Sequence, residues 1–403
     1  MDTTTTSGSS HCDQNCRPQA DIKKPAAPLI FLLAATAGLV VANIYYNQPI
    51  LNAIAATFKV GPAAVAWVST ATQIGYAAGL LFVVPLGDGL DRKWLIIGSA
   101  LLSSVILIIL PVSPNLPFML CASFALGFAS VAPQLAVPYA AGLMPGAGRG
   151  KIVGTVMSGL LIGVLLSRTL SGLIGSRFSW QVVYLAAAGV MVVLAAILWI
   201  ALPSQPPHKS DSYLRLLASL PQLLRSEPII RRHSVLGALG FGTFSAFWTT
   251  LAFYLHSRPQ HYGPDVTGMF GLLAVTGALV APLAGHLGEN WTPRQINGLF
   301  FSLILLAFGV MLFSEQNTLI LLGIGVLLLD AGAQGNQIAN QARIYSLHPA
   351  LHSRINSVYM VTYFIGGSLG SFIGAQAWAI VGWSGVCATG MLLSVAALIF
   401  LWI

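Results

Sequence analysis

Long apolar runs separated by short polar segments recur along the whole 403-residue chain. Each run holds ~20–28 residues, and at ~1.5 Å per helical residue this length crosses ~30 Å of hydrocarbon. The pattern therefore predicts an all-α polytopic membrane protein with twelve transmembrane helices. We expect these spans near residues 29–56, 63–86, 94–113, 117–143, 152–176, 180–202, 234–257, 266–287, 296–314, 319–347, 355–380 and 384–403.

The predicted spans fall into two sets of six. Residues 1–28 are rich in Thr and Ser and predict a disordered cytoplasmic tail, and residues 29–202 form the first six-helix bundle. The polar segment 203–233 is a cytoplasmic linker. Its leucines recur at helical spacing, which is typical of an amphipathic helix on the membrane surface, and an ordinary solvated linker is the alternative. Residues 234–403 form the second bundle.

An internal repeat supports the division into two pseudo-symmetric halves. A shift of 203 positions superimposes identical residues from the fourth predicted span to the sixth. Chance similarity between apolar segments is the alternative, and one constant shift over three spans argues against it. Two repeated halves with a binding site between them near mid-membrane are a known transporter design. The matched pairs are Gln134 with Gln337, Ala136 with Ala339, Ile152 with Ile355, Met157 with Met360, Gly163 with Gly366, and Trp180 with Trp383.

Composition also indicates lipid as the solvent. Hydrophobic residues make up 56% of the chain, charged residues only 7%, and the mean hydropathy is +0.79, whereas a soluble domain carries about 25% charged residues. The net charge of +8 does not indicate nucleic-acid binding, because the basic residues lie singly between apolar runs. No nucleic-acid partner is therefore expected.

Loop charges predict that both termini face the cytoplasm, because Lys and Arg gather in cytoplasmic loops. With the amino terminus inside, the outer segments hold only Lys59, Arg177 and Arg258. The inner segments hold Arg17, Lys23, Lys24, Arg92, Lys93, Arg149, Lys151, Lys209, Arg215, Arg225, Arg231, Arg232, Arg294 and Arg354.

The loop after the second predicted span resembles the signature of the major facilitator superfamily. It reads Pro85-Leu-Gly87-Asp88-Gly89-Leu90-Asp91-Arg92-Lys93, where the family has Gly, three residues, then Asp-Arg and basic residues. The resemblance implies the major facilitator fold of two six-helix bundles. It also implies that Gly87 permits a tight turn and that Asp91 and Arg92 form a charge latch at the inner face. The family's second Gly and paired basic residues are missing here.

The fifth predicted span resembles the antiporter motif of drug:proton antiporters in the same superfamily. Gly154, Gly163, Ser167-Arg168 and Ser171-Gly172 follow its spacing, and small residues at such spacing let helices approach closely. Arg168 stands where that family has Pro, which weakens the drug-antiporter assignment more than the fold. Segments 43–51 and 334–343 resemble a bacterial group usually placed with the twelve-span drug:proton antiporters.

Few charged residues remain inside the predicted spans, and such residues usually mark function. Asp330 lies near the middle of the tenth span, and burial disfavours the ionised form of a carboxyl group. We therefore expect Asp330 to carry the coupling proton, and a permanent structural ion pair with Arg168 or Arg343 is the alternative. Arg343 lies near the inner end of its span, where it can reach the headgroups as an anchor.

Amide and aromatic side chains within the spans predict a hydrated central cavity, although hydrogen bonding between helices is the alternative for each of them. The candidates for this cavity are Asn43, Tyr46, Asn47, Gln48, Gln73, Gln134, Tyr139, Trp248, Gln334, Gln337, Asn340 and Gln341.

No phosphate-binding loop, zinc-protease motif or nucleophile elbow occurs in the sequence, so neither ATP-driven transport nor enzyme activity is expected. The cysteines indicate no disulfide framework, and His11, Cys12 and Cys16 lack the second half of a usual metal site. We expect no metal ion and no cofactor.

These patterns predict a secondary active transporter that exports small, partly apolar compounds such as drugs or metabolites in exchange for protons, by alternating access. A symporter or facilitator for a polar metabolite or organic anion is the alternative, and a non-transporting membrane sensor is a minor one. The expected partners are a small-molecule substrate, protons and the lipid bilayer. The resemblance implies a multi-pass protein of the bacterial cytoplasmic (inner) membrane that functions as a monomer.

Overall fold

The computed structural model describes residues 27–143, 149–204, 213–273, 291–315, 319–345, 347 and 352–402. Within these ranges the chain is helical apart from short turns and connections. In the part of the chain that the structure describes, eleven helical segments are long and apolar enough to cross a membrane. Of the predicted span 266–287, only the first part is described, because residues 274–290 lie outside the described residues.

The helices of the first half follow the predicted spans. They are α1 (Ala27–Ala42), α2 (Asn47–Phe58), α3 (Pro62–Val65), α4 (Trp67–Phe82), α5 (Leu86–Gly89), α6 (Arg92–Ile109), η1 (Leu110–Val112), α7 (Leu116–Ala129), α8 (Ala132–Gly142), α9 (Arg149–Arg177) and α10 (Trp180–Ala201).

The helices of the linker and second half continue in the same order. They are α11 (Tyr213–Ser226), α12 (Pro228–Ser257), α13 (Pro264–Leu273), α15 (Pro293–Leu312), η2 (Phe313–Glu315), α16 (Leu319–Tyr345), α17 (His352–Val381) and α18 (Trp383–Phe400). Helix α11 has the amphipathic pattern read from the linker, with Leu216 and Leu220 buried and Arg215 and Arg225 exposed.

Proline explains why the first span is divided into α1 and α2. Pro49 has no N–H to donate to the carbonyl of Tyr45, and its ring crowds that carbonyl. The helix is interrupted over residues 43–46, which form a turn. The fourth span is likewise divided at Ser130 and Val131, next to Pro133. Such breaks free backbone groups inside the bundle for contacts with other helices.

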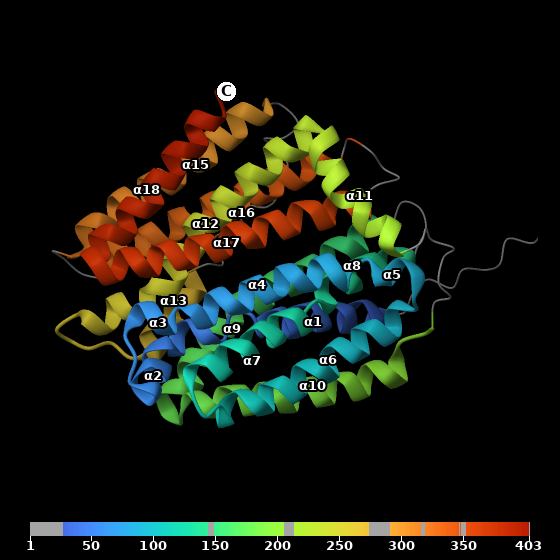
Figure 1. Cartoon of the computed structure of the whole chain (residues 1–403), viewed down its shortest axis with the longest axis horizontal. Coiled ribbons are helices and arrows are strands. Elements are labelled where there is room, and N and C mark those ends of the chain that lie inside the picture. Colours follow the sequence, from blue (N-terminus) through green and yellow to red (C-terminus); the bar gives the residue numbers. More distant parts are fainter. Residues whose placement is uncertain are drawn as a thin grey trace, which may run out of the picture.

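The helices gather into two groups, α1–α10 and α11–α18, seen as the lower and upper parts of Figure 1. Glycine lets one helix pair in each group approach closely. A Cβ at Gly163 of α9 would lie 2.2 Å from the carbonyl oxygen of Gly38 in α1, and one at Gly366 of α17 would lie 2.3 Å from that of Ala238 in α12. Gly163 and Gly366 are partners in the sequence repeat, so the repeat has a counterpart in the helix packing.

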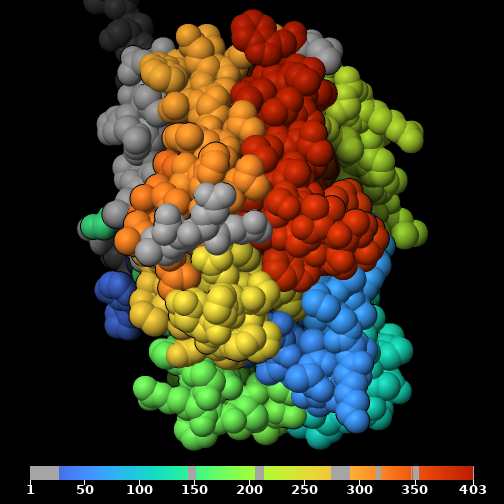
Figure 2. Space-filling model, turned by 90° about the vertical axis from the view of Figure 1, so that its left-hand side faces the viewer, coloured from blue at the N-terminus to red at the C-terminus, as the bar shows by residue number. Residues whose placement is uncertain are grey.

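Among the described residues, the main contacts between the two groups are those of α2 with α12 and α13, of α17 with α3 and α4, and of α9 with α13. In the α9–α13 pair, Thr169 donates a hydrogen bond of 3.0 Å from Oγ1 to the carbonyl of Gly268. In the α4–α17 pair, the rings of Trp67 and Phe372 lie 5.0 Å apart. We call this end of the bundle the predicted outer end. Figure 2 views it directly and shows the blue residues of the first half against the red and yellow residues of the second.

Candidate functional site at the interface of the two halves

Arg168 of α9 is fully buried, with 0% of its side chain exposed. Its Nε donates a hydrogen bond of 2.7 Å to Oε1 of Gln48, the second residue of α2. The break in the first span sets this geometry, because it begins α2 beside α9. Ser171, one turn after Arg168, donates from Oγ to the carbonyl of Tyr46 at 2.5 Å and fixes the same break against α9.

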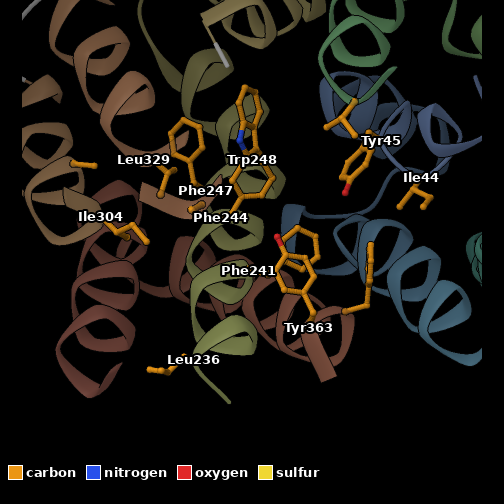
Figure 3. Close-up of a cluster of buried hydrophobic side chains, with 14 of the residues drawn as sticks. Ile44, Tyr45, Leu236, Phe241, Phe244, Phe247, Trp248, Ile304, Leu329 and Tyr363 are labelled. Atoms are coloured by element: carbon orange, nitrogen blue, oxygen red, sulfur yellow. The ribbon is translucent and has the colours of Figure 1, made fainter. Parts of the chain in front are cut away.

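Three aromatic rings surround the guanidinium group of Arg168. Its central carbon lies 4.0 Å from the ring centroid of Trp248, 4.8 Å from that of Tyr45 and 5.3 Å from that of Phe244. Such contacts stabilise a cation by ~2 kcal/mol or more when water is excluded. Tyr45 belongs to the first half, and Phe244 and Trp248 lie on α12 of the second. Figure 3 shows Tyr45 opposite these two rings.

Asp330 of α16 lies at the same depth as Arg168. It is 1% exposed and stands about 16 Å along its helix from the predicted outer end, while Arg168 stands about 14 Å from that end, at ~1.5 Å per residue. Both distances are about half of the ~30 Å hydrocarbon thickness. The two ionisable groups therefore lie near mid-membrane, one from each half.

Arg168 and Asp330 line one small cavity together with Leu161, Val164, Leu165, Phe244 and Gln334. The cavity has room for about one water molecule. Within the described residues, both terminal nitrogens of Arg168 and Oδ2 of Asp330 have no hydrogen-bond partner, and the two groups form no ion pair within 4.0 Å. Arg168 and Asp330 are thus a buried cation and a buried acid that line the same cavity without forming an ion pair with each other.

Other predicted cavity residues link the halves or brace the second half. Gln73 of α4 donates from Nε2 to Oγ of Ser371 in α17 at 3.0 Å. Gln134 of α8 accepts at Oε1 from Nδ2 of Asn356 in α17 at 3.2 Å. Gln337 accepts from the hydroxyl of Tyr363 at 3.0 Å within the second half.

The polar residues of the first span brace its helix break. Asn43 donates from Nδ2 to the sulfur of Met191 at 3.6 Å. Asn47 donates to the carbonyl of Ile44 at 3.2 Å and accepts at Oδ1 from the hydroxyl of Ser69 at 2.5 Å. These contacts of Asn43 and Asn47 hold the helix break in place. Of Asn43, Asn47 and Gln48, it is Gln48 that hydrogen-bonds to Arg168.

Four of the predicted residues lie away from Arg168 and Asp330, toward the opposite end of the bundle. Tyr139 donates to the carbonyl of Pro203 at 2.6 Å, Asn340 pairs through Oδ1 with Nδ1 of His233 at 2.6 Å, and Gln341 donates to the sulfur of Met360 at 3.6 Å. Arg343 is exposed near the end of α16. The structure does not bring these four side chains into the small cavity.

The residues of the predicted inner latch cluster around α5 and the start of α6. Arg92 forms an ion pair of 3.1 Å with Asp88, one turn earlier. Asp91 caps α6 by accepting from the backbone N–H of Lys93 at 2.9 Å, and it also accepts from the hydroxyl of Ser204. Gly87 packs against Leu135 so closely that a Cβ would lie 2.8 Å from its Cδ2 atom.

The predicted antiporter-motif residues lie along α9 on more than one face. Gly163 packs on α1, and Gly172 packs on α13, where a Cβ would lie 2.3 Å from the carbonyl oxygen of Pro264. Ser167 donates to the carbonyl of Val164 in its own helix at 2.7 Å. A Cβ at Gly154 would meet nothing within 4 Å. Helix α9 therefore contacts its own half through Gly163 and the opposite half through Gly172.

Tyr45 is a residue of this site that the sequence marks only indirectly, although it lies within segment 43–51. The signal was indirect: a lone arginine within an apolar helix needs several partners, and an aromatic ring is one such partner. Leu161, Val164 and Leu165 line the cavity on the same α9 face as Arg168, which helical periodicity alone places near it.

Comparisons with known proteins agree with this architecture. The family model described as Major Facilitator Superfamily matches residues 30–371. The uncharacterized transporter YgaY of Escherichia coli O157:H7 is 40% identical over 374 residues, covering 93% of this chain and 95% of the relative. The inner membrane transport protein YnfM of Escherichia coli K12 is 27% identical, covering 98% and 97%.

Solved structures show the same fold. The nucleoside transporter NupG superimposes with a TM-score of 0.75 at 13% identity, covering 93% of this chain and 98% of the other. A bacterial homolog of the human lysosomal transporter Spinster, in an inward-facing conformation, gives 0.72 at 15% identity, covering 94% and 95%. The twelve-helix fold predicted from the sequence is confirmed, and the chain is a multi-pass inner-membrane transporter that belongs to the major facilitator superfamily.

Proposed function

We propose that this transporter is proton-coupled and moves a small compound by alternating access between its two halves, with Asp330 as the group that carries the proton. One observation supports this most directly: Oδ2 of Asp330 in the second half and both terminal nitrogens of Arg168 in the first half have no hydrogen-bond partner within the described residues, and both side chains line one cavity near mid-membrane. Protons, a small-molecule substrate and the bilayer are the proposed partners.

The charge of this cavity changes with the protonation of Asp330. With Asp330 ionised, its charge balances that of Arg168 and favours contact between the halves. With Asp330 neutral, Arg168 leaves a net positive charge, and the same contact loses its Coulomb attraction. A proton therefore has a different free energy of binding in the closed and open arrangements, which is what a coupled conformational change requires.

Export in exchange for protons is the direction expected from the spacing of small residues along α9. The close packing of α9 on both α1 and α13 supports the idea that α9 lies on the surface along which the halves rock. A proton moving inward across 100 mV supplies ~2.3 kcal/mol, enough to drive such export. The tight outer-end contacts α9–α13 and α4–α17 would have to open in each cycle.

A second candidate is cotransport of an organic anion with a proton, and Arg168 favours it. A fixed buried cation beside the cavity repels a cationic drug and attracts an anion. Arg168 occupies the position where the drug-antiporter motif has Pro, so the departure from the motif supplies the charge that distinguishes the two candidates.

Purified protein in sealed vesicles with an imposed pH gradient tests the proposal. We expect a labelled compound to accumulate against its own gradient, and we expect a protonophore to abolish the accumulation. Export toward the side with more protons indicates exchange, and entry together with protons indicates cotransport. Equal transport with and without the pH gradient, for every compound that moves, would contradict proton coupling.

A further inference from the structure

The hydrogen bonds of Arg168 leave one edge of its guanidinium group open. Nε donates to Gln48 at 2.7 Å, and the guanidinium carbon lies 4.0 Å from the centroid of the Trp248 ring. Both terminal nitrogens lack partners among the described residues, while the side chain is 0% exposed. An unpaired buried charge is costly. The open edge points to a partner that arrives from outside the chain.

We propose that this edge binds the carboxylate of a small monocarboxylate with an apolar body, so that Arg168 is the substrate-recognition residue. This inference rests on the proposed proton coupling and, of its two candidate directions, favours cotransport of an organic anion over export in exchange for protons. A carboxylate matches the two terminal nitrogens of a guanidinium with two parallel hydrogen bonds. Gln48 and the aromatic rings hold the guanidinium plane fixed before the ligand binds, which lowers the entropic cost of binding.

The remaining lining of the cavity selects an apolar body with one negative charge. Leu161, Val164, Leu165 and Phe244 offer carbon surface, and among the described lining residues Gln334 adds the neutral polar group. One carboxylate neutralises Arg168. A second negative charge would have no cation among the described residues that line the cavity. The space present holds about one water molecule, so a substrate enters when the halves separate.

The two charges of the site also fix the sign of the coupling. A bound carboxylate beside ionised Asp330 would leave two negative charges facing one guanidinium, and this repulsion disappears when Asp330 takes a proton. Proton and anion therefore bind together rather than in competition. The consequence is cotransport, with no net charge carried by a monoanion and one proton.

On the described parts of the helices packed against α16, no other ionisable group is among the residues that line the cavity. On α12, His233 pairs with Asn340, about three turns away. On α15, Arg294 donates to the carbonyl of Leu401. On α17, Tyr363 donates to Gln337. On α13, Asp265 lies at the first turn of the helix. Within the described residues that line the cavity, Arg168 is the charged group that faces Asp330.

Calorimetric titration of the full-length protein in detergent tests the inference. The probes share one ring: benzoate as the monocarboxylate, benzamide as its neutral analogue, benzylamine as the cation and phenyl phosphate as the dianion. We expect benzoate to bind at least about tenfold more tightly than the other three, the effect of one charge-assisted pair. Titration in two buffers of different ionisation enthalpy should show uptake of up to one proton per benzoate.

Three variants separate recognition from coupling. Arg168→Gln should weaken benzoate binding at least about tenfold, and Arg168→Lys should recover part of it. Asp330→Asn should keep benzoate binding and lose the proton uptake. Arg177→Gln removes an exposed arginine near the end of the same helix and should change neither. As a control for folding, each variant must elute as a single folded species before it is titrated.

Some outcomes overturn this inference and leave the proposed function standing. Binding of benzamide or benzylamine as tight as that of benzoate would overturn it, as would no binding of benzoate at millimolar concentration. Proton-driven transport of a neutral or cationic compound that still depends on Asp330 would then support the proposed function alone. Benzoate binding that needs Arg168 but takes up no proton would keep carboxylate recognition and overturn the coupling sign together with the proton-carrying role of Asp330.

Discussion

The ring of Trp248 lies 4.0 Å from the guanidinium carbon of Arg168, so a residue of the second half covers the buried cation of the first. This contact crosses the interface that alternating access must open. Its strength therefore contributes to the balance between the closed and open arrangements, in addition to any role in holding the guanidinium plane.

Replacement of Trp248 should show how much the ring stabilises the closed arrangement. Trp248→Leu removes the cation–π contact and should lower the free energy of unfolding by ~2 kcal/mol or more. Trp248→Phe keeps an aromatic face and should lower the free energy of unfolding by less than Trp248→Leu does. Thermal unfolding of the purified protein in detergent measures both, and equal losses for Leu and Phe would contradict a cation–π contribution.

Gly163 and Gly154 offer a matched pair on one helix. A Cβ at Gly163 would lie 2.2 Å from a backbone oxygen of α1, whereas a Cβ at Gly154 would meet nothing within 4 Å. We predict that Gly163→Val destabilises the protein by ~1–3 kcal/mol or more, because backbone must move, and that Gly154→Val costs much less. Melting temperature and yield from membranes measure the difference; similar losses at the two positions would contradict the α1–α9 packing.

A cross-link at the predicted outer end should stop transport. Trp67 and Phe372 belong to opposite halves, and their rings lie 5.0 Å apart, so cysteines at these positions are within reach of a short thiol cross-linker. Cross-linking Trp67→Cys with Phe372→Cys, in a chain without its native cysteines, should block transport until a reducing agent is added. Either single-cysteine variant should remain active. Unchanged transport by the cross-linked protein would mean that this contact does not open.

The predicted orientation can be checked with two exposed arginines. Arg177 ends α9 and Arg225 lies in α11, and loop charges place the first outside and the second inside. In intact cells, a membrane-impermeant maleimide should label Arg177→Cys and should label Arg225→Cys only after the cells are broken. The reverse pattern would invert the topology and the direction assigned to every proton movement.

Hydrophobic periodicity predicted the helices well, because each span must satisfy its own backbone in lipid. The paired motif residues of α9 also pointed to close helix contacts, since Gly163 and Gly172 leave space that only another backbone fills. The repeat of 203 positions anticipated the matching crossings at Gly163 and Gly366. These features could be predicted because they depend only on local sequence and on the spacing of residues along the chain.

The sequence could not predict which partner each amide side chain of α16 contacts. Gln334 lines the cavity, Gln337 meets Tyr363, and Asn336 donates to Asn297 of α15. Helical spacing groups these residues by face, but which neighbour each face meets depends on how the helices are arranged in space. For the same reason the sequence did not predict the contact between Tyr45 and Arg168. This contact depends on the break in the first span, which brings Tyr45 beside α9.

The most direct measurement compares wild type and Asp330→Asn in sealed vesicles, using a compound that the wild type moves. We predict that Asp330→Asn still exchanges labelled for unlabelled compound down a concentration gradient, because the amide mimics the protonated carboxyl. It should no longer accumulate the compound when a pH gradient is imposed. Accumulation at the wild-type level by Asp330→Asn would show that the coupling proton is carried elsewhere and would contradict the proposed role of this residue.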